Sequence, residues 1–403
     1  MVKEGLTNFF ENFLKKEEIF ADKKILQISY IPDTIEHRGE QINHIAGILA
    51  PSLKLNRPSN IFIYGKTGSG KTVSIKHITK NMMDIAKSKD IPLEVIYVNC
   101  KLKRVADTEY RIIAQLAREI GKEIPNTGLP TDDVYRQFFD TLDKKKILLL
   151  LVLDEIDQLV NKAGDAVLYN LTRINEDLKN SQVSIIGISN NSRFIDMVDP
   201  RVKSSLSEED VLFPPYNALQ LQDILKQRAK KAFKLGVLEQ GVVEKCAAYS
   251  AKEHGDARRA LDLLRVAGEV AERKCSKTVK IDHIDEAEEK IEHDRVLDII
   301  TTQPKQSQAT LYAIMSLQSK DKETILTGQI YDVYNKICSQ IGLKALTQRR
   351  IGDIIAELDM LGVINAKVIS KGRYGRTREI VLATPEETNT KIKQLLAEGL
   401  DLS

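Results

Sequence analysis

Residues Gly65 to Thr72 match the pattern Gly-x-x-x-x-Gly-Lys-[Ser/Thr], which is typical of loops that bind nucleotide phosphates. Glycines let such a backbone curl until successive N–H groups face the phosphate oxygens. Lys71 would reach the β- and γ-phosphates, and the Thr72 hydroxyl would ligate Mg²⁺. The motif therefore predicts a site for ATP or ADP with Mg²⁺. Its candidate residues are Gly65, Lys66, Thr67, Gly68, Ser69, Gly70, Lys71 and Thr72.

Two carboxylates follow an apolar run further along the chain. Leu148 to Leu153 reads as a buried strand, and it ends in Asp154 and Glu155. Asp154 would hold Mg²⁺ through water, and Glu155 would polarise the water that attacks the γ-phosphate. The alternative is a capped strand end with two solvated acids. The phosphate loop upstream favours the catalytic interpretation.

A polar residue also follows the apolar run Val183 to Ser189. Asn190 would hydrogen-bond the γ-phosphate or the attacking water. The alternative is an ordinary turn, since Asn-Asn-Ser favours turns without any ligand. The two preceding motifs favour the functional interpretation of Asn190.

The C-terminal part carries residues that favour nucleic acid. A helix predicted over Thr347 to Leu361 would present polar side chains from its first turns to a major groove. The stretch Lys344 to Arg378 holds eight Lys and Arg against three Asp and Glu, a local net charge of about +5 where the whole chain has +3. Alternatives are a solvated basic loop and a winged helix that binds protein. The candidate DNA-binding residues are Gln348, Arg349, Arg350, Lys371, Arg373, Tyr374, Arg376 and Arg378.

These residues need an α/β scaffold to bring them together. Four short runs with continuous apolar character predict a parallel sheet that is covered on both faces, with helices between the strands. The predicted strands are Asn60 to Tyr64, Leu93 to Asn99, Ile147 to Leu153 and Val183 to Ser189. No strand is expected between Tyr216 and Ile300, where the pattern predicts helices at Leu219 to Phe233, Glu239 to Glu253, Asp256 to Lys274 and His283 to Ile299.

The third region reads as a winged helix. Helices are expected at about Ala309 to Ser319 and at Gly328 to Ile341, before the helix already described. Two strands, Ile364 to Ser370 and Glu379 to Leu382, would form the wing. Thr301 to Pro304 is a predicted linker, and the tail after Pro385 is polar and expected to fray. The predicted domains are 1–215 (with an N-terminal extension, 1–20), 216–300 and 301–403.

Composition limits the class of protein. Charged residues make up 29% and hydrophobic residues 42% of the 403 residues, as in soluble globular proteins. The four cysteines form no Cys-x-x-Cys pair, so neither a zinc site nor a disulfide framework is expected. No apolar run is long enough to span a bilayer. We expect a cytoplasmic, nucleoid-associated protein without a membrane partner.

The order of these motifs, with Asp199-Pro200-Arg201 and Gly255 to Arg258 after them, resembles the AAA+ ATPases. Ile35 to Arg38 followed by Gln41, and Val98-Asn99-Cys100, resemble one branch of them. That branch is the origin-recognition and licensing (cell division control) family in its archaeal replication-initiator form. The resemblance covers roughly residues 20–385. It implies an AAA+ domain, a helical lid and a C-terminal winged helix.

The resemblance also implies roles for single residues. Asn190 matches the first sensor, and Arg258 matches the second sensor, which reaches the γ-phosphate from the lid. Arg201 matches the position of an arginine finger that acts on a neighbour's ATP. This chain lacks the Ser-Arg-Cys motif in which clamp loaders carry that finger. His37 and Arg38 match the segment that closes over the adenine.

A helical insertion of initiators touches DNA close to Leu102 to Ile120, where Lys101, Lys103 and Arg104 supply positive charge. An ordinary surface helix explains the same residues equally well. The resemblance implies an ATP-dependent initiator that binds double-stranded origin DNA, hydrolyses ATP slowly and uses its ATP or ADP state as a switch for helicase loading. Its partners would include the replicative helicase and paralogous initiators. The alternative is a DNA-bound regulatory paralogue whose nucleotide is structural.

Overall fold

The computed structural model describes residues 18–101, 108–125, 127–318, 325–370, 376–383 and 386–402. The chain divides into two compact units, and the boundary along the sequence falls between Ile284 and Asp285. We call them the N-terminal unit and the C-terminal unit. Among the described residues, no helix is both long and apolar enough to cross a bilayer.

A five-stranded parallel sheet forms the centre of the N-terminal unit, with strand order β2-β3-β4-β1-β5. Four strands lie where the apolar runs predicted them: β1 (Ile61–Tyr64), β2 (Leu93–Asn99), β3 (Leu148–Asp154) and β4 (Gln182–Ser189). The edge strand β5 (Glu209–Leu212) was not predicted. Its charged, half-exposed residues lack the continuous apolar character of the buried strands.

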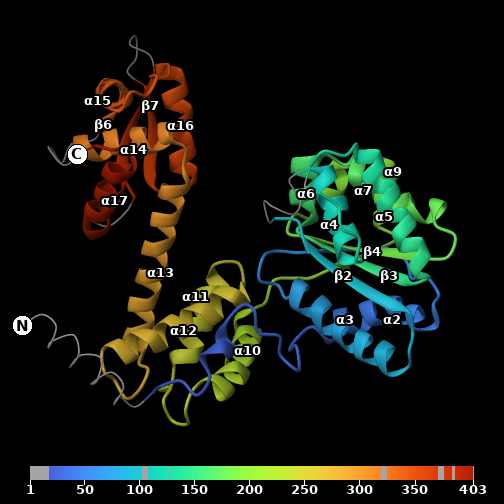
Figure 1. Ribbon diagram of the computed structural model, residues 1–403. Helices are drawn as coiled ribbons and strands as arrows, with labels where there is room; N and C mark the ends of the chain where they lie inside the picture. The colour runs from blue at the N-terminus through green and yellow to red at the C-terminus, as the bar shows by residue number, and fades with distance from the viewer. Residues whose placement is uncertain are drawn as a thin grey trace, which may run out of the picture. The chain divides into compact units, whose positions relative to one another are not determined.

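Helices cover both faces of this sheet (Figure 1). On one face α2 (Gly39–Leu49) and α3 (Lys71–Ser88) pack through Ile45, Ile75 and Ile78. The other face carries the larger apolar core, and each of its helices turns one apolar stripe inward. Its helices are α4 (Glu109–Glu119), α5 (Thr131–Lys145), α6 (Ile156–Ala163), α7 (Ala166–Asp177), α8 (Phe194–Met197) and α9 (Pro200–Leu206).

A helical lid follows β5 in the same unit. It consists of α10 (Ala218–Ala232), α11 (Val242–Lys252) and α12 (Ala257–Arg273), close to the predicted helices. Asn217 and Gln220 form a capping box that fixes the start of α10. The short segment η1 (Lys23–Leu26) packs against this lid, where Arg228 donates a hydrogen bond to the Ile25 carbonyl. A further short helix, η2 (Ala50–Lys54), directly follows α2.

The C-terminal unit joins helices to a small antiparallel sheet with strand order β6-β8-β7. Its core includes Tyr334, Ile351 and Ile355. Its elements are most of α13 (Ile281–Thr302), then α14 (Lys305–Gln318), β6 (Ile325–Leu326), α15 (Thr327–Gln340), α16 (Gln348–Met360), β7 (Ile364–Ser370), β8 (Arg376–Leu382) and α17 (Glu386–Gly399).

The predicted linker, Thr301 to Pro304, is shorter in the structure: α13 runs on to Thr302, so only Gln303 and Pro304 separate it from α14. Another expectation for this region was wrong. The predicted fraying tail is the helix α17, in which Ile392 and Leu396 are buried against the core. Its sequence looks polar because only one narrow stripe faces inward.

Candidate nucleotide and nucleic-acid sites

One cavity of about 740 Å³ in the N-terminal unit gathers most of the residues predicted for the nucleotide. They come from the loop between β1 and α3, the carboxyl ends of β3 and β4, and the amino end of α12. These strand ends meet at one edge of a parallel sheet, where such folds bind ligands. The polar end of the cavity is lined by Gly68, Ser69, Gly70, Lys71, Thr72, Asp154, Glu155, Asn190 and Arg258.

Lys71 lies folded back over the loop that carries it. Its Nζ donates hydrogen bonds to the Gly65 carbonyl (2.7 Å) and the Lys66 carbonyl (2.8 Å). Burial lowers the pKa of Lys71 to about 8; the Asp154 carboxylate opposes this shift, and the Arg258 guanidinium adds to it. A buried cation thus lies at the N-terminus of α3, and this combination suits an anionic ligand.

Asp154 is the centre of the hydrogen-bond network at this end. The Thr72 hydroxyl donates to its Oδ2 at 2.9 Å, and the Tyr97 hydroxyl donates to the same oxygen. The Glu155 amide donates to its Oδ1 at 3.0 Å. Asp154 is only 4% exposed, so its carboxylate has little contact with water. The three donors supply the hydrogen bonds that a buried carboxylate needs and hold it in one orientation.

Glu155 sits in a left-handed backbone conformation, with φ 56° and ψ 47°. That conformation is uncommon for residues other than glycine and clusters at functional sites. Here it turns the chain sharply from β3 into α6, so that Glu155 lines the cavity beside Asp154. Lys101 Nζ lies 4.0 Å from the Glu155 carboxylate.

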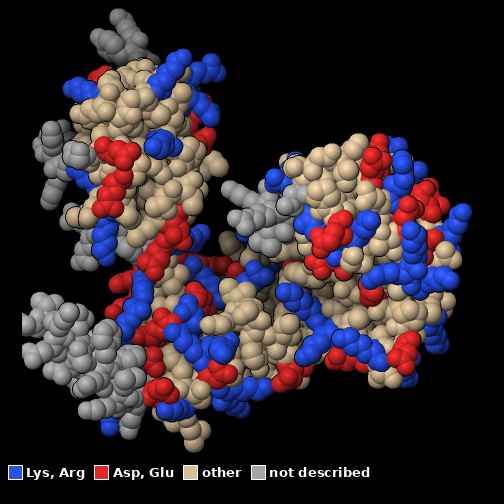
Figure 2. Space-filling view, viewed as in Figure 1, with Lys and Arg blue, Asp and Glu red and all other residues tan. Residues whose placement is uncertain are grey.

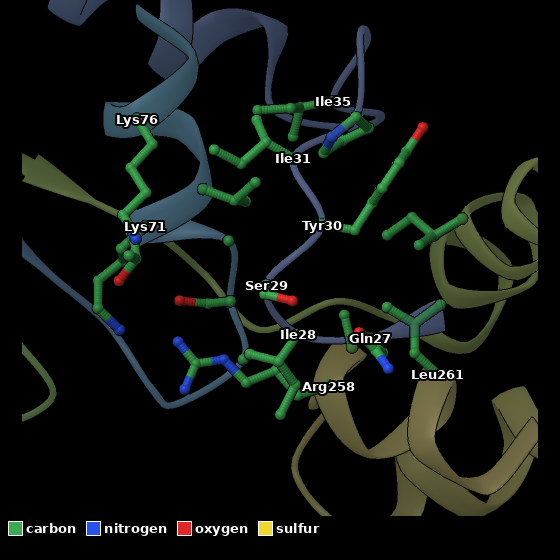
Figure 3. Close-up of a pocket in the computed structure, with 18 of the residues that line it drawn as sticks. Gln27, Ile28, Ser29, Tyr30, Ile31, Ile35, Lys71, Lys76, Arg258 and Leu261 are labelled. Carbon is green, nitrogen blue, oxygen red and sulfur yellow. The ribbon is translucent and has the colours of Figure 1, made fainter. Parts of the chain in front are cut away.

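The lid closes the polar end from the opposite side. Arg258 extends from the lid helix α12 into the cavity, across from Lys71 and Lys76 on α3 (Figure 3). Asp256 caps α12 by accepting a hydrogen bond from the Arg258 amide at 2.8 Å. The Ala257 amide donates to the Gly68 carbonyl at 3.3 Å, so the lid contacts the phosphate loop directly.

The other end of the cavity includes several apolar side chains. The segment Gln27–Ile31 runs along it (Figure 3), and Ile35 lies beside that segment. The lid contributes Ile224 and Leu261. Apolar side chains next to a phosphate-binding end fit the planar base and the charged tail of a nucleotide.

Some of the predicted cofactor residues do not line the cavity. The described residues that line the cavity do not include His37, Arg38, Gly65, Lys66 or Thr67. His37 Nε2 lies 3.0 Å from the Asp223 carboxylate on α10. Arg38 is only 2% exposed and donates to the Ser69 carbonyl behind the phosphate loop.

Arg201 lies outside this cavity on α9. Its Nε and Nη2 donate to the two carboxylate oxygens of Asp199 at 3.0 and 2.9 Å, and its guanidinium lies 4.7 Å from the centre of the Tyr169 ring. The hydrogen bonds from Arg201 lower the pKa of Asp199 to about 2. The Arg201 side chain is 65% exposed, so it is held in place yet accessible from outside the unit.

The sequence did not indicate Tyr97, Lys76 or the segment Gln27–Ile31 as parts of the cavity. Lys76 stands one turn after Thr72 on α3, and its Nζ lies 4.5 Å from the centre of the Tyr97 ring. Tyr97 carried one signal: it is a polar side chain two residues before the carboxyl end of β2. The segment Gln27–Ile31 has no motif, and only its packing brings it to the cavity.

In the C-terminal unit, α16 begins at Gln348, one residue after the predicted start, and the Thr347 side chain caps it. Gln348, Arg349 and Arg350 are exposed on its first turn, whereas Ile351 and Ile355 face the core. Lys and Arg side chains gather on this unit towards the α16 side (Figure 2). Gln348 and Arg349 line a groove with Val368, Thr377 and Arg378 of the two wing strands.

Arg378 also has a structural contact. Its Nη1 donates to the Gly352 carbonyl of α16, which ties the wing strand β8 to the helix. The predicted DNA-binding residues Lys371, Arg373 and Tyr374 lie outside the described residues, as does the side chain of Arg376. Lys103 and Arg104 of the predicted insertion also lie outside them; the helix that follows is α4.

Comparisons with known proteins agree with this architecture. A family model described as an AAA domain matches residues 55–193, and one described as a Cdc6 AAA+ ATPase-type lid domain matches residues 222–289. A model of the CDC6 C-terminal winged helix domain matches residues 298–391. The AAA domain supports the prediction that the ligand is ATP or ADP.

Proteins of similar sequence cover nearly the whole chain. The ORC1-type DNA replication protein of Pyrococcus abyssi is 53% identical over 381 residues, which are 94% of this chain and 90% of that protein. The ORC1-type DNA replication protein 1 of Methanosarcina acetivorans is 49% identical over 395 residues, 97% of this chain and 94% of its own.

Solved structures show the same fold. The structure of the Aeropyrum pernix ORC1 protein in complex with DNA is 41% identical, has a TM-score of 0.83, and is matched over 95% of this chain and 98% of that one. Cdc6p from Pyrobaculum aerophilum shares the fold at 19% identity, with a TM-score of 0.60 over 95% and 99% of the two chains. By sequence, domain content and structure, the chain belongs to the family of archaeal ORC1-type DNA replication proteins, which is the origin-recognition and licensing branch of the AAA+ ATPases.

Proposed function

We propose that this chain is a replication initiator that binds ATP or ADP with Mg²⁺ in its N-terminal unit and origin DNA through its C-terminal unit. Its nucleotide state would act as the switch for helicase loading. The observation that carries the proposal is that the phosphate loop, Asp154 and Arg258 line one cavity in a chain that is 53% identical to an ORC1-type DNA replication protein.

The residues at the polar end fit a magnesium nucleotide. Thr72 Oγ1 and Asp154 Oδ2 lie 2.9 Å apart, and hydroxyl and carboxylate oxygens are the donors that Mg²⁺ prefers. Mg²⁺, when bound, supplies charge neutralisation at the β- and γ-phosphate oxygens. Glu155 would orient the attacking water, Asn190 would hydrogen-bond it or the γ-phosphate, and Arg258 would sense that phosphate from the lid.

Hydrolysis by a single molecule is expected to be slow. Arg201 lies outside the cavity of its own chain and is accessible, which supports a role as an arginine finger on the ATP of a neighbour. Such a residue contributes about 10³–10⁵ in turnover. A chain without its neighbour would therefore hydrolyse bound ATP slowly and remain in its ATP state for a long time, as a switch requires.

The DNA-binding part of the proposal depends on the C-terminal unit. Gln348, Arg349 and Arg350 are exposed on the first turn of a helix beside two wing strands, an arrangement that suits a major groove. The Aeropyrum pernix relative was solved in complex with DNA, and it matches nearly the whole of this chain. Positive charge around α16 would supply phosphate contacts.

Binding to duplexes tests this proposal. Affinity for an origin-repeat duplex is compared with affinity for a shuffled duplex of the same composition, across a series of stated salt concentrations. We expect tighter binding to the origin repeats at every salt concentration, because base contacts add to the phosphate contacts. Equal affinity for the two duplexes at physiological salt would contradict sequence-specific recognition.

Nucleotide content and turnover separate the switch from other uses of the same site. Purified protein is denatured, and the released ADP or ATP is quantified; turnover is then measured with and without origin DNA. We expect bound nucleotide and slow turnover, with origin affinity or helicase recruitment that differs between the ATP and ADP forms. DNA binding that is indifferent to the nucleotide would instead indicate a regulatory paralogue with a structural nucleotide.

A further inference from the structure

Arg38 is a buried cation behind the phosphate loop. It stands at the start of α2, directly after His37, whose backbone is left-handed with φ 59°. The residue is 2% exposed. Burying a guanidinium is unfavourable unless its N–H groups are hydrogen-bonded. The partners of these N–H groups therefore indicate the role of the side chain.

The donors of Arg38 reach three carbonyl groups. Its Nε donates to the Ser69 carbonyl of the phosphate loop at 2.8 Å, and its Nη1 donates to the His37 carbonyl at 3.1 Å. Its Nη2 donates to the Pro214 carbonyl, in the segment that joins β5 to the first lid helix. We call residues 213–216, which lie between β5 and the first lid helix, the hinge. One planar group thus bonds to the phosphate loop and to the hinge.

The face of the same guanidinium packs on the hinge. Its central carbon lies 3.8 Å from the centre of the Tyr216 ring and 5.7 Å from the centre of the Phe213 ring. Contact with a ring face stabilises a desolvated cation. The hinge segment, residues 213–216, therefore holds Arg38 through one carbonyl and two rings.

Tyr216 itself lies between the loop and the lid. A Cβ added at Gly70 of the phosphate loop would lie 2.6 Å from the Tyr216 hydroxyl, and one at Gly255 would lie 2.2 Å from the Tyr216 carbonyl oxygen. Gly255 directly precedes Asp256, which caps the helix that carries Arg258. The Tyr216 side chain therefore lies against Gly70 of the loop and its backbone lies against Gly255 of the lid, at two positions that leave no room for a larger residue.

We propose that Arg38 is a positioning residue that couples the phosphate loop to the lid hinge, and that it is not a ligand of the nucleotide. The guanidinium is rigid, and its three carbonyl partners fix it in one orientation. A shift of the Ser69 carbonyl when phosphates enter the loop must move the guanidinium or break a buried hydrogen bond. Either change reaches Pro214 and Tyr216, and through them the orientation of the lid.

The inference depends on nucleotide binding in the cavity, as proposed above, but part of its test needs no nucleotide. Cys275 is exposed on the lid side of the N-terminal unit, while Cys100, Cys246 and Cys338 are buried. With Lys87→Cys added at the exposed end of α3, the full chain can carry a fluorophore pair that reports the distance between core and lid.

Four variants of the labelled chain are compared with the parent. Arg38→Met removes the donors, and Arg38→Lys keeps the charge but cannot reach three carbonyls at once. Arg57→Met is the control for the same substitution elsewhere: this exposed arginine donates to the Val183 carbonyl at 3.0 Å and lies 3.5 Å from the Glu208 carboxylate, at the end of the sheet opposite the phosphate loop. Tyr216→Leu serves as a second lesion on the hinge side if Arg38→Met does not fold.

In the parent and in Arg57→Met, we expect a narrow core-to-lid distance distribution that shifts when ADP is added. Arg38→Met, Arg38→Lys and Tyr216→Leu should broaden the distribution without nucleotide and lose the ADP-dependent shift. For the two Arg38 variants, the ADP dissociation constant, measured with a fluorescent ADP, should rise by less than about tenfold, because Arg38 does not line the cavity.

Other outcomes overturn the inference in distinguishable ways. If Arg38→Met keeps both the narrow distribution and the full shift, Arg38 does not couple the loop to the hinge. If it loses ADP binding altogether while Arg57→Met does not, Arg38 acts as a ligand residue. A parent chain that fails to bind ADP contradicts the proposed function. The coupling is then decided by whether the core-to-lid distance distribution without nucleotide is broader in Arg38→Met than in the parent.

Discussion

At the scale of single residues, the cavity shows how one carboxylate can be held by several donors. Asp154 accepts hydrogen bonds from the Thr72 hydroxyl, the Tyr97 hydroxyl and the Glu155 amide. Thr72 and Asp154 are also the predicted metal-binding residues. Tyr97 would not hold the metal itself, but its hydrogen bond orients the Asp154 carboxylate, which would hold it. Such supporting partners typically affect metal affinity or activity by about 10–100-fold.

Tyr97→Phe tests this support. Removing the hydroxyl leaves the ring in place and frees the Asp154 carboxylate to rotate, so we expect the Mg²⁺ concentration for half-maximal ATP turnover to rise about tenfold. Tyr135→Phe is the control, since the Tyr135 hydroxyl also donates to a carboxylate, that of Glu109, at 2.7 Å. An unchanged magnesium requirement in Tyr97→Phe would refute the role of the hydroxyl.

At the scale of elements, the start of the described chain is attached to the lid by charge. Lys23 of η1 lies 2.6 Å from the Glu269 carboxylate on α12, and Arg265 of the same helix bonds to that carboxylate too. Burial opposes ionisation of Glu269, but Lys23 and Arg265 outweigh it and lower the pKa of this carboxyl. The attachment matters for the cavity because residues Gln27–Ile31 follow η1 directly.

The lowered pKa gives a stability prediction with a definite sign. A carboxyl whose folded pKa lies below its unfolded value stabilises the fold above the unfolded pKa, and this contribution is lost as the pH falls through the folded pKa. Glu269→Gln should therefore lower the free energy of unfolding by about 1 kcal/mol near neutral pH. The difference from the parent should vanish in acid, which thermal unfolding at a series of pH values would show.

Glu244→Gln provides the control, because Glu244 pairs with Lys226 at 3.3 Å while both side chains are largely exposed. Exposed ion pairs contribute little, so this variant should unfold close to the parent at neutral pH. A larger loss in Glu244→Gln than in Glu269→Gln would contradict the importance we give to the attachment of η1.

The last helix, α17, is a second element with a testable role. Leu396 is 2% exposed in the core of the C-terminal unit, whereas its neighbour Leu395 is 37% exposed. Leu396→Ala should destabilise the C-terminal unit by about 2–5 kcal/mol, and Leu395→Ala by much less. Thermal unfolding of the full chain, followed by limited proteolysis, would locate the loss. Equal stability of the two variants would mean that α17 does not complete the core.

At the scale of the whole molecule, the two candidate sites lie in different compact units. The nucleotide cavity belongs to the N-terminal unit, and the exposed first turn of α16 belongs to the C-terminal unit. Variants of one site should therefore leave the intrinsic affinity of the other site nearly unchanged. Any dependence of DNA binding on nucleotide must then come from coupling between the sites.

Two sets of variants test this separation. Lys71→Ala should weaken ATP and ADP binding because it removes the buried cation of the loop, and it should spare most of the DNA affinity. Arg349→Ala with Arg350→Ala should weaken DNA binding, reduce the salt dependence by about one unit of slope for each lost phosphate contact, and spare nucleotide binding.

A charge-matched control keeps the second set specific. Lys391 is exposed on α17, away from the first turn of α16 in sequence, and Lys391→Ala also removes positive charge from the C-terminal unit. DNA affinity should fall much less in this variant. If the arginine pair and Lys391→Ala have equal effects per charge, DNA binding depends on net charge and not on α16.

The sequence alone determined the features that depend on neighbouring residues. The phosphate loop needs glycines and a lysine at fixed spacing, and continuous apolar runs mark buried parallel strands, so β1 to β4 and the position of Asp154 could be predicted. The start of α16 was predictable because Thr347 caps it and an apolar stripe follows. For these features, local backbone requirements and hydrophobic periodicity are sufficient.

Only the tertiary structure decided features that depend on partners far away along the chain. Edge strand β5 and helix α17 lack a strong pattern because each buries only a small part of its surface. The segment Gln27–Ile31 and Tyr97 reach the cavity through packing, which no local motif encodes. Arg38 was predicted as a cofactor-binding residue in the segment that resembles the one closing over the adenine; its burial and its hydrogen bonds to the Ser69 and Pro214 carbonyls could not be predicted. A side chain's neighbours in space, which sequence spacing does not give, set its electrostatic environment and therefore its role.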